Sequence, residues 1–160
     1  MFKVFKVIHI VGVAMFLGSI FAHIATGLVP GAADQAPAML AARQAIELAT
    51  RYVTVPGLVV AIVSGALMVA TAHRGFFKRR WLVLHMAAVA VIAAITVIVM
   101  IPVGQELVAA AKAVGAGTMT PAAFAGAAIR EHLFGAVNIL LALAAIALGA
   151  AKPRLGQGQI

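Results

Sequence analysis

Five histidines are the residues of this sequence whose chemistry fits least well with their surroundings. His9 and His23 stand at the two ends of the apolar segment HIVGVAMFLGSIFAH, His85 lies inside a second apolar run, and His132 directly precedes a third. A polar side chain in an apolar environment is costly unless it has a partner, and neutral imidazole is the commonest metal ligand in proteins. The positions of these rings therefore predict either hydrogen bonds between helices or a bound metal group.

The elements that must hold these histidines are long apolar helices. Of the 160 residues 64% are hydrophobic and only 10% are charged, which is too little polar surface for a soluble domain. Four apolar runs approach the ~20 residues that an α-helix needs to cross a bilayer; they cover residues 7–29, 52–70, 81–101 and 133–151. Because backbone groups within lipid must bond internally, we expect an all-α, transmembrane four-helix bundle. We expect residues 7–29 to be a retained span, not a cleaved signal peptide, because the run is long and carries two histidines.

Charged residues predict how this bundle lies in the membrane. Four spans place eight basic residues on one side: Lys3, Lys6, Arg74, Lys78, Arg79, Arg80, Lys152 and Arg154. The other side holds four basic residues and all four acids: Arg43, Arg51, Lys112, Arg130, Asp34, Glu47, Glu106 and Glu131. The positive-inside rule then places both termini in the cytoplasm. The net charge of +8 thus reflects topology, and we expect no nucleic-acid partner.

The segments between the spans carry helix signals of their own. The stretch PAMLAARQAIELATRY has helical spacing and lies on the outer surface or extends the second helix outward. Pro56 is expected to kink the second helix, and Pro102 to end or bend the third. Thr120 and Pro121 read as an N-cap and first helical residue, so the fourth helix begins outside the bilayer. We see no internal repeat in the sequence and expect one domain, 1–160.

The depths of the histidines divide them into two levels. His9 and His23 are fourteen residues apart, so they share a helix face and stand roughly 21 Å apart along its axis. Measured from the basic residues at the inner boundary, His85 lies near His9, at about 5–8 Å, and His132 lies near His23, at about 25–30 Å. His73 lies at the inner boundary within a basic loop and is a weaker candidate, which we expect to be solvated.

Two imidazoles from different helices at one depth can ligate a haem iron from both faces, which supports one-electron transfer. We therefore expect two haem b groups, one between His9 and His85 and one between His23 and His132. Arg51 and Arg130 are the expected partners of the outer propionates. The inner propionates would lie near the basic loop that contains Arg74, Lys78, Arg79 and Arg80. The alternative is that each histidine only hydrogen-bonds a neighbouring helix.

The segment VIHIVGVAMFLGSIFAH resembles the first helix of small bacterial membrane families. These families are the copper-resistance D-like proteins, the membrane protoporphyrinogen oxidase of haem synthesis and related uncharacterised integral membrane proteins. The four-helix plan with two histidine levels is similar to di-haem membrane cytochromes b, including the bacterial superoxide oxidase. These resemblances imply a multi-pass protein of the bacterial inner membrane. The cytochrome resemblance implies electron passage between a quinone and a second redox partner.

The leading expectation is thus a di-haem membrane protein that carries electrons across the bilayer, with quinone contacts at Arg51, Tyr52 or Glu131. Three alternatives stay open: copper or other metal handling, a haem-dependent porphyrin-oxidising enzyme, and a non-catalytic membrane subunit. Histidine and methionine suit copper, but His9 and His23 are too far apart to share one ion. The absence of cysteine excludes disulfides and thiolate ligands. The spans contain no acidic residue, which argues against a carboxylate-based proton carrier.

Overall fold

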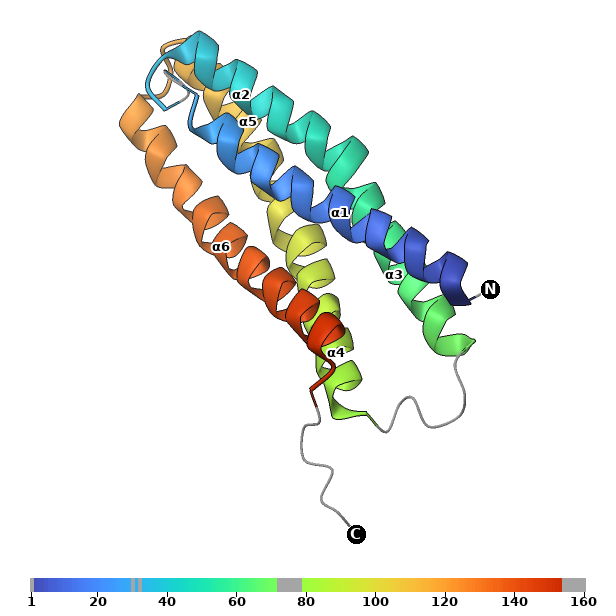
Figure 1. The fold of residues 1–160 in the computed structure, drawn as a ribbon. Helices are drawn as coiled ribbons and strands as arrows, with labels where there is room; N and C mark the ends of the chain where they lie inside the picture. The colour runs from blue at the N-terminus through green and yellow to red at the C-terminus, as the bar shows by residue number, and fades with distance from the viewer. Residues whose placement is uncertain (1, 30, 32, 72–78, 154–160) are drawn as a thin grey trace.

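The computed structural model describes residues 2–29, 31, 33–71 and 79–153, and these residues form an all-α bundle. Its elements, in chain order, are α1 Phe2–Gly27, α2 Ala36–Ala49, the π-helical turn η1 Thr50–Thr54, α3 Val55–Ala70, α4 Arg80–Ile95, the π-helical turn η3 Thr96–Met100, α5 Ile101–Gly115 and α6 Pro121–Ala151 (Figure 1). The segments α2, η1 and α3 follow one another without a break, as do α4, η3 and α5. The described chain therefore folds into four long helices that are apolar enough to span a membrane.

Two of these helices extend well beyond the predicted spans. The expected second and third helices, 52–70 and 81–101, prove to be parts of the continuous helices Ala36–Ala70 and Arg80–Gly115, with 35 and 36 residues. At 1.5 Å per residue they are roughly 53 Å long, against about 30 Å for the hydrocarbon core. The apolar runs marked only the part that fits in lipid. Outside the lipid the same helices continue with a mixed composition that hydropathy alone does not detect.

Pro56 and Pro102 are accommodated inside these long helices by the π-helical turns. Each proline lies two residues after the end of such a turn, η1 before Pro56 and η3 before Pro102. A proline ring in a regular helix clashes with the carbonyl four residues earlier, and the wider π turn relieves that crowding. The chain therefore does not end its third helix at Pro102. Thr120 does cap α6 as expected, since its side chain accepts a hydrogen bond from the Ala123 backbone N–H at 3.2 Å.

The helices pack as two antiparallel pairs, α1 with α3 and α4 with α6, and α2 packs against α5. Glycines bring α1 and α3 into backbone contact. A Cβ atom at Gly12 would lie 2.6 Å from the Ala61 backbone nitrogen, and one at Gly57 would lie 2.8 Å from the Phe16 nitrogen. This is the close packing through small residues that is common between membrane helices.

The middle of the bundle consists of two layers, each with one residue from every long helix. The first is an apolar cluster of Phe16, Leu58, Ile92 and Ala142. The second is polar and contains two hydrogen-bonded pairs, Ser19 with Thr54 at 2.6 Å and Asn138 with Thr96 at 3.1 Å. All members of both layers are buried.

These layers reveal a repeat that the sequence did not show by inspection. Ile92 follows Phe16 by 76 residues, and Thr96 follows Ser19 by 77. Ala142 and Asn138 each follow their counterparts, Leu58 and Thr54, by 84 residues. The pair α4/α6 therefore places residues in both layers at positions equivalent to those of the pair α1/α3, which indicates an approximate two-fold relation between the two halves.

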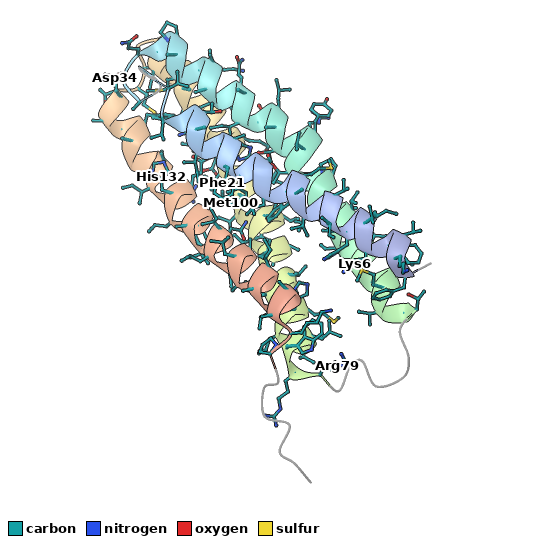
Figure 2. All side chains as sticks on the ribbon, viewed as in Figure 1. Lys6, Phe21, Asp34, Arg79, Met100 and His132 are labelled. Carbon is teal, nitrogen blue, oxygen red and sulfur yellow. The ribbon has the colours of Figure 1, made fainter. Side chains whose placement is uncertain are left out.

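The end of the bundle away from the termini has a separate core. This outer cap is built from α2, α5 and the first turns of α6, around the cluster of Met39, Val103, Leu107, Ala110, Ala111, Val114, Phe124 and Ala128. The first turn of α1 and the last turn of α6 lie at the opposite end (Figure 1). Figure 2 shows Lys6 and Arg79 at that opposite end and Asp34 at the outer cap. Along the spans large apolar side chains are exposed, as lipid contact requires.

Candidate functional site

His9 and His85 face each other across the bundle at its basic end. His9 lies on α1 and His85 on α4, and both are half-buried. Their ring centroids are 6.3 Å apart and their planes are inclined at 54°. The structure thus brings together the two inner histidines that the depth argument paired.

A backbone carbonyl of the partner helix holds each of these two rings. His9 Nδ1 lies 2.8 Å from the Ala61 carbonyl oxygen on α3, and His85 Nδ1 lies 2.8 Å from the Ala145 carbonyl oxygen on α6. A carbonyl oxygen can only accept, so Nδ1 carries the proton and donates in both cases. Nε2 of each neutral ring is then an unprotonated acceptor. Within the described residues no hydrogen bond to either Nε2 is present.

Glycines provide the space for both rings. A Cβ atom at Gly65 would lie 3.3 Å from His9 Cε1, and one at Gly149 would lie 3.6 Å from His85 Cε1. Each glycine stands four residues after the alanine whose carbonyl accepts the hydrogen bond, and Gly149 follows Gly65 by 84 residues, as Ala145 follows Ala61. The histidine supports therefore obey the same two-fold relation as the central layers.

The distance between the two ring centroids agrees with that of two imidazoles bound to one metal. A metal–nitrogen bond of about 2.0–2.1 Å on each side, with roughly 1.1 Å from ring centre to nitrogen, separates two opposed centroids by about 6.3 Å. Metal-binding histidines also commonly donate their other ring N–H to a backbone carbonyl, which fixes the tautomer and the ring orientation. The described residues contain no cluster of three or more His, Asp or Glu side chains that could hold a metal ion, so a group bound here would need its other ligands from elsewhere.

The expected outer pair is not brought together in the same way. His23 is half-buried, its Nε2 lies 3.3 Å from Ser19 Oγ, and the Glu131 carboxylate acts on it electrostatically. His132 is exposed on α6. Among the described residues the His9–His85 pair makes the only ring contact between histidines. His73, the weaker inner candidate, lies outside the described residues.

The charged candidates at the outer end are engaged with one another. Arg130 forms an exposed ion pair with Glu106, and the Arg51 guanidinium lies 5.8 Å from the Tyr52 ring centroid. Arg43 and Glu131 form a second ion pair, with side chains only 10% and 15% exposed. The sequence did not predict the ion pair of Arg43 with Glu131, because a basic residue in a segment outside the spans is expected to be solvated.

Sequence reasoning also missed the supports of the inner histidines, although a signal for them exists. The segments AIVSG, from Ala61 to Gly65, and AIALG, from Ala145 to Gly149, share the pattern of alanine, isoleucine and a glycine four residues after the alanine. A search for short repeats at one spacing would have found this pair. The role of these two segments in holding His9 and His85 depends on helix–helix contacts, which the sequence does not show.

Comparison with known proteins supports the membrane assignment and adds no chemistry. No curated protein and no solved structure matches the chain. A family model described as a predicted integral membrane protein, DUF2269, matches residues 3–153, which is nearly all of the chain. Together with four helices long and apolar enough to cross a bilayer, this match shows that the chain is an integral membrane protein that belongs to the DUF2269 family.

Proposed function

We propose that this membrane protein binds haem b between His9 and His85 and carries electrons between a quinone and a second redox partner. The observation that carries the proposal is the matched pair of imidazoles, each with Nδ1 held by a helix carbonyl and Nε2 left as an acceptor. Packing alone does not require a second imidazole whose ring centroid lies 6.3 Å away, the separation expected across one metal.

The surroundings of the pair suit a haem. The site lies between the two helix pairs α1/α3 and α4/α6, which diverge toward the end that carries the termini (Figure 1). Exposed basic side chains border that end and can meet the propionates, among them Lys6, Arg80 and Lys152.

A haem held by His9 and His85 would supply one-electron transfer. The protein's part would be to fix the orientation of the two rings through the Ala61 and Ala145 carbonyl oxygens. The site lies near the basic end of the bundle, and by the positive-inside rule we expect this end to be at the cytoplasmic surface. The contacts with the quinone and with the second redox partner would lie toward the opposite end of the bundle, at the outer cap.

A visible spectrum of the purified protein tests the proposal. After haem-replete expression we expect a low-spin b-type spectrum in the reduced-minus-oxidised difference, haem in the pyridine haemochrome assay, and little reaction with carbon monoxide. His9→Ala and His85→Ala should each remove the inner haem or open it to carbon monoxide. His132→Ala is the matched control, because this histidine is exposed, and it should leave the inner haem unchanged. Haem content that is the same in wild type, His9→Ala and His85→Ala would contradict the proposal.

Copper handling is the second candidate, and one observation favours it. Two unprotonated Nε2 atoms at this spacing would also suit a linear two-coordinate Cu(I) ion. The haem proposal is preferred because a porphyrin itself supplies four ligands to its iron, whereas the described residues place no third His, Asp or Glu beside the pair. Purified protein that lacks haem and binds one copper per chain, lost in His9→Ala, would support copper instead.

A further inference from the structure

We propose that Ser64 is a positioning residue that acts through His9, makes His9 the more strongly polarised of the two axial ligands and lowers the reduction potential of the site. This inference rests on the proposed function, because it takes His9 and His85 as the ligands of a haem iron. Ser64 lies on α3 and is 2% exposed, so its hydroxyl is shielded from water.

The Ser64 hydroxyl lies beside the hydrogen bond that holds the His9 ring. Its Oγ atom is 3.4 Å from His9 Nδ1. The same atom is 2.5 Å from the Val60 carbonyl oxygen and 3.2 Å from the Ala61 carbonyl oxygen. A hydroxyl has one proton to donate, and the shortest contact identifies the Val60 carbonyl oxygen as its acceptor. The lone pairs of Oγ are then available to the Nδ1–H group of His9.

His9 therefore has two oxygen atoms near its Nδ1 proton. The Ala61 carbonyl oxygen, at 2.8 Å, accepts the main hydrogen bond, and Ser64 Oγ is the longer and weaker contact. In a buried site the dipole of such a hydroxyl is poorly screened. Its negative end faces the ring, which stabilises positive charge on the imidazole and makes Nε2 a more basic ligand.

The other half of the bundle lacks this hydroxyl. Ala145 follows Ala61 by 84 residues, and each supplies the carbonyl oxygen for one ring. The same spacing places Leu148 on α6 where α3 has Ser64. His85 Nδ1 nevertheless lies 2.8 Å from its carbonyl oxygen, the same distance as at His9. The hydroxyl is therefore not needed to hold a ring in place, and its effect is on the charge distribution of His9.

This inequality has a consequence for the iron. A more basic axial imidazole stabilises ferric iron more than ferrous iron, because ferric iron carries the larger positive charge. Ser64 would therefore lower the reduction potential. Ser64→Ala removes Oγ and keeps a good helix former, and the Val60 carbonyl oxygen loses only the additional hydroxyl contact. The variant should thus fold and bind haem as wild type does.

Potentiometric titration of the full-length, haem-bound protein tests the inference. Ser64→Ala should keep the haem content and shift the reduction potential upward. Leu148→Ser places a hydroxyl at the equivalent position of the second half and should give a lower potential than its matched control Leu148→Ala, which removes the same side chain without adding an oxygen. The double variant Ser64→Ala/Leu148→Ser should return toward the wild-type potential.

Nuclear magnetic resonance of the ¹⁵N-histidine-labelled, reduced protein separates polarisation of one ring from a general change. In Ser64→Ala the Nδ1 proton of His9 should move upfield, whereas that of His85 should stay in place. A potential in Ser64→Ala that is unchanged or lower, or equal shifts of the two rings, would overturn the inference and leave the proposed function intact. Protein purified without haem would overturn both.

Discussion

At the scale of single residues, the chemistry of this protein depends on which nitrogen of each imidazole is left free. The Ala61 and Ala145 carbonyl oxygens take the Nδ1 protons of His9 and His85, so both rings direct the remaining nitrogen away from their own helix pair. At His85, alanine and glycine do this alone, because the helix backbone supplies the acceptor and the missing side chain supplies the room. At His9, Ser64 Oγ also lies 3.4 Å from Nδ1.

The two outer ion pairs give a residue-scale prediction about stability. Arg43→Ala leaves Glu131 buried without its partner and removes the guanidinium that lies 5.2 Å from the Phe124 ring centroid. Loss of one partner of a buried pair costs about 3–5 kcal/mol. Arg130→Ala removes one partner of the exposed pair with Glu106 and should cost less than about 1 kcal/mol. Thermal unfolding in detergent measures both, and equal losses would contradict the difference in burial.

At the scale of elements, the helix pairs are the rigid units and the π-helical turns adjust their register. The α1/α3 pair is held by backbone contact at Gly12 and Gly57, immediately beside the carbonyl that positions His9. The turns η1 and η3 directly precede Pro56 and Pro102 and allow both long helices to continue past their prolines.

The α1/α3 contact gives an element-scale prediction. In Gly12→Ala the new methyl group would lie 2.6 Å from the Ala61 nitrogen, so the helices must separate. Overpacking of this kind costs about 1–3 kcal/mol, and the shift of Ala61 should also lower haem binding at His9. Gly18→Ala is the matched control on the same helix, because no atom lies within 4 Å of its new methyl group. Denaturant unfolding should give a lower free energy of unfolding for Gly12→Ala than for Gly18→Ala, and haem titration should show weaker binding. Equal values for the two variants would show that α1 and α3 are not packed this closely.

At the scale of the whole molecule, charge and the two-fold relation give the bundle its direction. Among the described residues, the ends of α1, α4 and α6 away from the outer cap carry Lys3, Lys6, Arg79, Arg80 and Lys152, whereas the four acids lie just before α2 or on α2, α5 and α6. The outer cap has its own buried core at that second end.

The orientation in the membrane is the prediction at this scale. The chain has no cysteine, so single cysteines can be introduced without a background signal. Thr118→Cys, in the exposed turn before α6, should react in intact cells with a membrane-impermeant thiol reagent. Lys152→Cys, at the end of α6, should react only after the membrane is permeabilised. The reverse pattern would place the termini outside and invert the inner and outer levels.

The sequence by itself determined the helical class, the four long apolar helices and the N-cap at Thr120. These follow from local rules, because hydropathy measures what fits in lipid and a cap depends only on neighbouring residues. The pairing of side chains across the bundle was decided by the tertiary structure. Lipid-facing and core-facing surfaces are both apolar here, so the sequence pattern does not show how each helix is rotated. That rotation brings His85 to His9, exposes His132, buries Arg43 with Glu131 and places Met100 beside Gly135.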